Sequence, residues 1–217
     1  MLPVGWERIY RQKGDPGYGV LPRIRRASKE FRLKNYTRIL DLGCGTGRHS
    51  IYLAKQDFSV VASDIAPTGL GIARNKAKSL GLNNIEFKLH DMRSIPLEND
   101  CIDGVICIWV LHHGTLEDIK TTIREIHRIL KPGGMVITDL SSVETESYGI
   151  GKEIECNTFI GDKKDEEDVP HHYTTREELT RLFSPFQQHR IRLCTKFYTD
   201  EEGRKHFRKK FHVKAVK

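Results

Sequence analysis

The sequence lacks the features that mark membrane-spanning, secreted and disulfide-bonded proteins. None of its apolar runs approaches the ~18 residues of a transmembrane helix. Its first residues show no basic region followed by an apolar one, so a signal peptide is not expected. The five cysteines are scattered at positions 44, 101, 107, 156 and 194, without a C-x-x-C pair. Such an odd, scattered set argues against disulfides and a zinc framework, and predicts a cytoplasmic protein.

Positive charge is in excess, and it is concentrated at the end of the chain. The 217 residues include 36 Lys and Arg against 29 Asp and Glu, a net charge of +7. Residues 204–217 hold seven basic residues and no acid, whereas residues 162–168 form an acidic run. The basic segment could dock RNA or another protein. Its alternating basic and apolar residues also fit an edge strand whose lysines deter aggregation, which we favour, so a nucleic-acid partner is disfavoured.

One short segment, residues 39–48 (ILDLGCGTGR), is the most informative part of the sequence. An apolar strand reaches Asp41 and then runs into glycines at 43, 45 and 47, and a helix-like segment follows. These glycines let the backbone turn tightly and let a ligand approach closely. Loops of this kind hold nucleotide-like cofactors in α/β sheets. In a dinucleotide fingerprint the third glycine would stand where this chain has Arg48, so a pyrophosphate cofactor fits poorly.

From Asp41 to Gly47 the loop resembles the first motif, D-x-G-x-G-x-G, of class I methyltransferases that use S-adenosylmethionine (SAM). Three later features agree: a strand-like segment ends in Asp64, another ends in Asp91, and residues 130–134 (LKPGG) lead from a helix into a strand. Alternating strands and helices from 37 to 142 independently predict an α/β fold. The resemblance covers about residues 36–142 with specific motifs.

The resemblance implies a particular architecture. We expect a Rossmann-like, doubly wound sheet of seven mostly parallel strands, with an antiparallel C-terminal edge strand. Residues 1–217 would form a single methyltransferase domain. It would consist of an N-terminal helical cap (1–35), a SAM-binding core (36–142), and a substrate-side insertion with the C-terminal strands (143–217).

The resemblance also implies roles for individual residues. Asp64 would hold the ribose hydroxyls of SAM, and Asp91 with Met92 would frame the adenine. The backbone around Gly43 and Gly45 would approach the methionine part. The other expected cofactor contacts are Asp41, Cys44, Gly47, Ile65, Ile108 and Trp109.

The acceptor side is less defined by the sequence. His112 and His113 follow the fourth strand and could act as a general base, since histidine titrates near neutral pH. The alternative, which we favour, is that they only fill hydrogen bonds. A metal site is not expected, because no acid or cysteine accompanies them at ligand spacing. The candidate substrate contacts, each of which could instead be a packing residue, are Trp6, Tyr10, Tyr148, His172 and Tyr173, with His171 and Phe159 beside them.

Three functions compete. The first is a small-molecule methyltransferase, resembling the quinone-biosynthesis and the tellurite- and thiol-methylating groups. The second is an RNA or protein methyltransferase that docks through the basic C-terminal segment, and the third is a SAM-binding protein without catalysis. Residues 108–113 (IWVLHH) lack the Asn/Asp-Pro-Pro-aromatic motif of base amino-methylation, and the chain has no Pro-Cys pair. The first function is therefore favoured, while the acceptor atom and the oligomeric state stay open.

Overall fold

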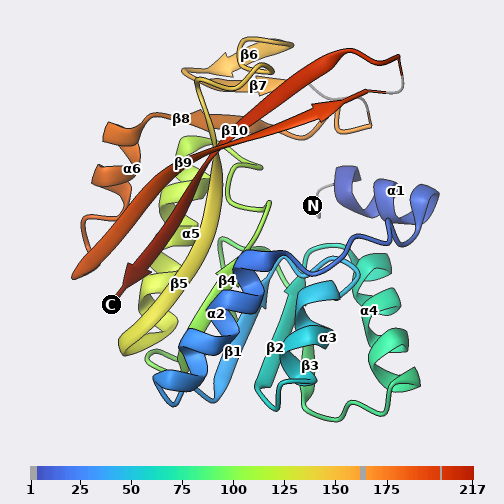
Figure 1. The fold of residues 1–217 in the computed structure, drawn as a ribbon, viewed down its shortest axis with the longest axis vertical. Coiled ribbons are helices and arrows are strands. Elements are labelled where there is room, and N and C mark those ends of the chain that lie inside the picture. Colours follow the sequence, from blue (N-terminus) through green and yellow to red (C-terminus); the bar gives the residue numbers. More distant parts are fainter. Residues whose placement is uncertain (1–3, 162–164, 201) are drawn as a thin grey trace.

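Strands and helices alternate along the computed structural model, which describes residues 4–161, 165–200 and 202–217 (Figure 1). The helices are α1 (Val4–Lys13), α2 (Pro22–Leu33), α3 (Arg48–Ala54), α4 (Pro67–Ser79), α5 (Leu116–Ile129) and α6 (Arg176–Leu182). The strands are β1 (Arg38–Leu42), β2 (Ser59–Asp64), β3 (Ile85–Leu89), β4 (Ile102–Cys107), β5 (Leu130–Ser142), β6 (Lys152–Glu155), β7 (Thr158–Ile160), β8 (His171–Thr174), β9 (Gln188–Thr199) and β10 (Lys205–Val216). The start of the predicted N-terminal cap (1–3) and of the acidic run (162–164) lies outside the described residues.

The main sheet has the strand order β3-β2-β1-β4-β5-β10-β9. The first five strands run parallel, and β10 lies antiparallel between β5 and β9. The predicted α/β sheet, mostly parallel with an antiparallel C-terminal edge, is confirmed. Two details differ. The outermost strand is β9 rather than the C-terminal β10, and the three short strands β8, β7 and β6 extend the sheet from seven strands to ten.

Hydrophobic patterning explains why these elements form. In α5, Ile119, Ile123 and Ile126 recur at helical spacing and are buried against the sheet. Thr115 begins this helix with a reciprocal capping box to Asp118, which satisfies backbone donors that the first turn leaves open. Helices α5 and α6 cover one face of the sheet, and α2 and α3 cover the other. All residues of β4 are buried, as expected for a strand covered on both sides.

The strand order reverses between β1 and β4, and this reversal positions the site. In open α/β sheets, ligands bind outside the carboxyl ends of the strands at such a switch point. The loops that follow β1, β2 and β4 all leave the sheet at this end. Asp64 is the last residue of β2, and the other two loops contain the glycines and the two adjacent histidines. Helix α1 lies near the same end (Figure 1).

The basic C-terminal segment is largely neutralised within the fold. Lys209 lies 2.8 Å from Glu144, and Lys217 lies 2.7 Å from Asp100. Lys214 pairs with Glu30 of α2. The expectation that this segment is an edge strand is wrong, because β10 is paired on both sides. These lysines therefore join the sheet to neighbouring acids. Within the described part of the chain, no helix combines the length and apolar character needed to cross a membrane.

Candidate functional site

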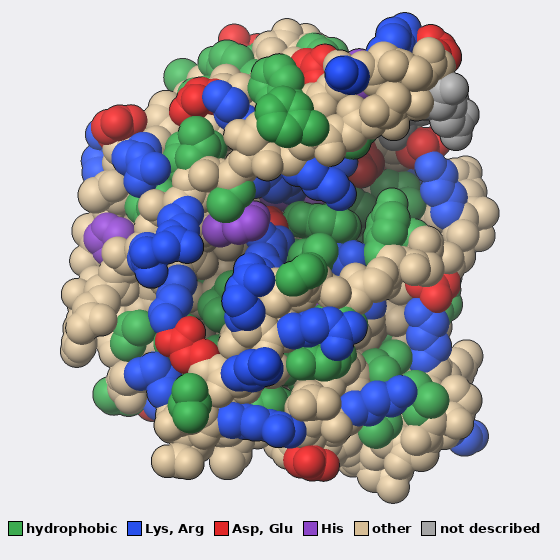
Figure 2. Space-filling view, viewed as in Figure 1, with side chains coloured by type: hydrophobic (Ala, Val, Ile, Leu, Met, Phe, Trp, Pro, Cys, Tyr) green, Lys and Arg blue, Asp and Glu red, His purple; other side chains and the backbone are tan. Residues whose placement is uncertain are grey.

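A cavity of about 1060 Å³ opens where β1, β2 and β4 end (Figure 2). It brings together most of the residues expected from sequence to bind cofactor: Gly43, Cys44, Gly45, Asp64, Ile65, Asp91, Met92, Ile108 and Trp109. The proposed acceptor-side residues Trp6, Tyr10, His112 and His113 line the same cavity. A second hollow of about 610 Å³, between α5 and α6, contains none of these residues.

The glycine loop is shaped by backbone hydrogen bonds to β2. Gly43 N and Cys44 N both donate to the carbonyl of Ser63, each at 2.8 Å. Gly45 N donates to Asp64 Oδ2 at 2.8 Å, and its φ of +56° favours glycine. A Cβ on Gly45 would collide with the Tyr10 hydroxyl, which lies over the loop. Because Gly45 has no side chain, a bound cofactor could approach the backbone of the loop closely.

Asp64 lies at the end of β2 in the position expected for a ribose contact. Its side chain is buried, with Oδ2 accepting from Gly45 N and Oδ1 accepting from Ala66 N at 2.9 Å. Burial raises the pKa of this carboxyl, and the backbone amides of Ala66, Gly45 and Ile65 partly oppose that shift. A carboxylate has about four lone-pair sites, so it can also accept from ligand hydroxyls. The remaining acceptor sites of Asp64 thus fit the hydroxyls of a ribose.

Asp41 and Gly47 belong to the same motif but do not line the cavity. Asp41 is buried beneath the loop, where Ser50 Oγ donates to it at 2.5 Å, and burial raises its pKa to about 6. Gly47 precedes α3, and a Cβ there would meet Ala73 of α4 at 2.8 Å. Direct cofactor contact by these two residues is therefore not supported; they support the loop from below and behind.

Asp91 lines the cavity but is engaged by an arginine. Arg93 Nε and Nη2 donate to its two oxygens at 2.9 and 2.5 Å, and Arg93 Nη1 donates to Asp118 at 2.9 Å. Burial acts to raise the Asp91 pKa, but the bonds from Arg93 outweigh it and lower the pKa overall. Contact with adenine would therefore use the remaining acceptor capacity of Asp91, with Met92 beside it.

Trp109 stands in a constrained backbone position at the rim of the cavity. Its φ is +63°, which is unusual for a bulky residue. The Trp109 amide donates to Asp139 Oδ1 at 2.9 Å, and Asp139 also pairs with Arg23 of α2. The guanidinium of Arg48 lies 4.3 Å from the indole centroid, within cation–π range. The buried Asp139 therefore holds both this backbone turn and a cation close to the cavity.

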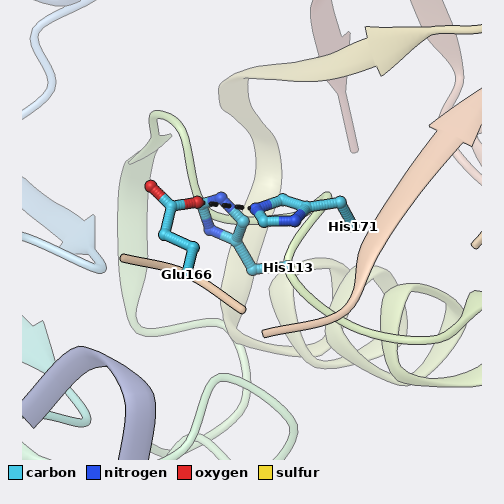
Figure 3. A group of neighbouring side chains, drawn as sticks. All are labelled: His113, Glu166 and His171. Atoms are coloured by element: carbon cyan, nitrogen blue, oxygen red, sulfur yellow. Dashed lines mark hydrogen bonds and ion pairs between the residues drawn. The ribbon is translucent and has the colours of Figure 1, made fainter. Parts of the chain in front are cut away.

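The two adjacent histidines differ in their surroundings. His112 is buried, and its Nε2 lies 3.4 Å from Lys210 Nζ. The His113 ring lies 4.7 Å from Trp6 of α1 and 5.0 Å from His171, measured between centroids. Glu166, which the sequence pattern did not single out, lies 2.7 Å from His171 (Figure 3). The reason for expecting no metal site therefore does not hold, because the fold brings an acid to these histidines from a distant segment.

Three candidate substrate contacts lie outside the cavity lining. Tyr148 donates to Asn157 Oδ1 at 2.6 Å and packs 5.6 Å from the ring of Tyr173. His172 is buried between Thr158 and Glu178, at 2.7 and 3.1 Å. Packing around β7 and β8 accounts for Tyr148, His172 and Tyr173. The sequence pattern also did not reveal that His171 to Thr174 form a strand.

Positively charged side chains form another part of the lining, which sequence motifs did not assign. We call this set the cationic wall: Arg23, Arg26, Arg48, Lys196, Arg208 and Lys210, from α2, α3, β9 and β10. Figure 2 shows Lys and Arg side chains around the hollow. Burial, followed by the nearby Arg48 and Arg23, lowers the pKa of His49 to about 3. The sequence signal was the alternation of basic and apolar residues, but only pairing of the strands shows which of them face the cavity.

Comparison with known proteins agrees with this geometry. Residues 39–134 match the profile of a methyltransferase domain. YqeM of Bacillus subtilis is 33% identical over 63% of this chain and 53% of its own length. A ubiquinone biosynthesis O-methyltransferase of Rickettsia akari is 30% identical over 63% and 57%. The chain thus spans about half the length of the curated relatives it matches.

A solved SAM-dependent methyltransferase of Methanosarcina mazei shares the fold. Its TM-score is 0.69 at 24% identity, and the match covers 92% of this chain and 99% of that one. Its likeness extends beyond the core to nearly the whole chain. Residues 39–134 are thus similar to a methyltransferase domain, and the chain shares the fold of a solved SAM-dependent methyltransferase.

Proposed function

We propose that this chain transfers the methyl group of SAM to a small-molecule acceptor by in-line displacement. The observation that carries the proposal is a single cavity, which runs from the glycine loop and Asp64 to His112 and His113. Cofactor and acceptor can then meet in one space, and such positioning can supply ~7–11 kcal/mol of the barrier. The Rickettsia relative, named for ubiquinone biosynthesis, supports a small acceptor.

The chain's residues would hold the cofactor from several sides. SAM supplies an electrophilic methyl group on a positively charged sulfur. Asp64 accepts hydrogen bonds from the ribose hydroxyls, and Met92 and Ile65 offer apolar surface to the adenine. The backbone at Gly45, which has no side chain, leaves room for the methionine part. Asp41 supports the glycine loop from beneath, through the hydrogen bond that it accepts from Ser50. Helix α1 covers the cavity with Trp6 and Tyr10, and thereby limits the access of water.

The cationic wall points to an acceptor that carries a carboxylate or phosphate group. Asp139 pairs with Arg23 in this wall. Among the described residues, Arg26, Lys196 and Arg208 form no ion pair, although all three line the cavity. Guanidinium and ammonium groups in such a setting bind anionic groups through charge-assisted hydrogen bonds. The role of His112 and His113 as proton acceptors stays a prediction.

A screen with labelled SAM tests the proposed function. The purified chain is incubated with SAM and with matched sets of anionic and neutral phenols, thiols and amines, and with bulk RNA. We expect methyl transfer and formation of S-adenosylhomocysteine with at least one anionic small molecule. Transfer to RNA alone would replace the proposal with the docking alternative. SAM binding without transfer to any acceptor would favour the non-catalytic alternative.

Replacing Asp64 tests the cofactor half of the cavity separately. Asp64→Ala should weaken SAM binding by ~1–3 kcal/mol, because a buried charge-assisted contact is lost. Asp64→Asn keeps one oxygen, which can accept from only one of the Gly45 and Ala66 amides, and should show a smaller loss than Asp64→Ala. Calorimetric titration measures both, with Glu86→Gln on β3 as a control acid outside the cavity. Equal affinity for all four proteins would contradict the ribose role.

The cationic wall yields a second prediction, on the acceptor. The double variant Lys196→Gln and Arg208→Gln should raise the KM of an anionic acceptor about tenfold or more, since each charged hydrogen bond contributes ~1.5–3 kcal/mol. SAM affinity should not change. Arg190→Gln with Arg192→Gln, both on β9 with Lys196 but outside the lining, removes the same charge and is the matched control. If both double variants raise the KM equally, overall charge rather than the wall binds the acceptor.

A further inference from the structure

Three side chains from distant parts of the sequence meet beside the cavity: His113, Glu166 and His171 (Figure 3). One potential ligand atom from each lies within 4.8 Å of the others. Glu166 Oε2 lies 2.7 Å from His171 Nε2, and the rings of His113 and His171 are nearly perpendicular at 5.0 Å. We propose that these three residues bind a divalent transition-metal ion of the zinc type.

The spacing of the three donors suits such an ion. Zinc binds nitrogen and oxygen at about 2.0–2.2 Å, so neighbouring ligands of a tetrahedral site stand roughly 3.4 Å apart. The donors here span this value, from 2.7 Å for Glu166 and His171 to a limit of 4.8 Å for the set. Entry of the ion requires the Glu166–His171 hydrogen bond to open by less than about 1 Å. Two imidazoles and one carboxylate, with one position open, form a known type of catalytic zinc site.

Each donor is held by surrounding structure. His171 is fully buried at the start of β8. The segment that carries Glu166 is tied to α1 by three ion pairs: Lys13 with Asp165 at 2.5 Å, and Arg8 with Asp168 at 2.8 Å and with Glu167 at 3.9 Å. The His113 ring packs against Trp6 of the same helix. Helix α1 therefore positions two of the three donors, and the site is complete only when this helix is in place.

The open position of the ion would face the methyl-transfer cavity, because His113 and Glu166 both line it. This role rests on the proposed function. An acceptor hydroxyl or thiol bound to the ion loses its proton to solvent more readily. The resulting anion attacks the methyl carbon, the carbon–sulfur bond breaks, and its electron pair stays on sulfur in neutral S-adenosylhomocysteine. The ion keeps its oxidation state throughout.

Zinc binding without SAM tests the site directly. Protein without a histidine tag is stripped with a chelator and titrated with Zn²⁺ in competition with a chromophoric chelator. We expect one tight site per chain. His113→Gln and Glu166→Gln should each weaken it about 100-fold or more, since even groups that only hydrogen-bond to a metal ligand contribute about 10–100-fold. Circular dichroism checks that the variants remain folded.

A matched control comes from another histidine with acidic partners. His206 lies 2.8 Å from Glu146 and 3.0 Å from Asp200 at the protein surface, away from the cavity lining. His206→Gln should leave Zn²⁺ affinity unchanged. Co²⁺ should give visible absorption bands of a four- or five-coordinate ion in the wild-type protein and the control, and lose them in Glu166→Gln.

The outcomes separate the metal site from the proposed function. If wild-type protein, His113→Gln and Glu166→Gln bind Zn²⁺ alike, or if only His206→Gln loses it, the metal site is overturned, whatever the methyl-transfer screen shows. Tight Zn²⁺ binding that needs His113 and Glu166 establishes the site even if the screen finds no acceptor. If both hold, methyl transfer should fall at least tenfold in stripped protein and return with Zn²⁺, while SAM affinity measured by calorimetry stays constant.

Discussion

Gly45→Ala should remove most SAM binding and leave the chain folded. Gly45 has a φ of +56°, and a Cβ there would collide with the hydroxyl of Tyr10, inside the cavity. Positive φ costs an alanine about 1–2 kcal/mol of stability. Forcing a methyl group into the cofactor space adds a further penalty on binding, and we expect ~10–100-fold weaker SAM affinity. Calorimetry measures the affinity and thermal unfolding measures the stability.

Two comparisons separate the collision from backbone strain. Gly81 has a φ of +68°, and a Cβ added there would meet no atom within 4 Å, so Gly81→Ala should lose similar stability without losing SAM affinity. Adding Tyr10→Phe to Gly45→Ala removes the hydroxyl that the new methyl group meets. Stability should then recover partly, whereas SAM binding should stay weak. Restored binding in this double variant would mean that Tyr10, and not the cofactor, needs the space above the loop.

The part of the cavity around the glycine loop was predictable because its residues are close together in sequence. The segment from Asp41 to Gly47 contains the strand end, the turn and the helix start, so local chemistry fixes its geometry. Asp64 follows from the same logic at the end of the next strand. Burial could not be assigned from the motif, however. Asp41 and Asp64 look alike in sequence, yet only Asp64 lines the cavity.

The acceptor half was not predictable in the same way, because it is assembled by long-range pairing. His113, Glu166 and His171 belong to three separate segments. The cationic wall depends on the register of β9 against β10, in which Lys196 pairs with Arg208. Strand β8 itself joins β5 through only two residue pairs, and its sequence, HHYT, has no alternation of apolar and polar residues. Patterns of this kind specify no strand until the neighbouring strand is known.

Asp139→Ala should destabilise the protein by about 3–5 kcal/mol, the loss expected when one partner of a buried ion pair is removed. Asp139 is fully buried on β5, and the side chain of its partner Arg23 is only 13% exposed. The neighbouring His212 does not supply a negative charge that could replace Asp139 beside Arg23. Burial and Arg23 lower the pKa of His212 to about 4, so this neighbouring imidazole is neutral at pH 7 and still lies in a cationic environment. Denaturant unfolding at pH 7 measures the change.

The same carboxylate also holds Trp109 through its backbone amide, so stability and cofactor binding can be separated by a second set of variants. Asp139→Asn keeps an oxygen for that amide but loses the charge, and should lower stability more than SAM affinity. Arg23→Met with Asp139→Leu replaces the pair by apolar groups and should recover much of the lost stability, because buried pairs exchanged as a unit are close to neutral. The double variant cannot restore the acceptor for the Trp109 amide. The positive φ of Trp109 would then no longer be stabilised by this hydrogen bond. SAM affinity should therefore stay low in the double variant. A double variant that recovers both stability and affinity would show that Asp139 serves only the ion pair.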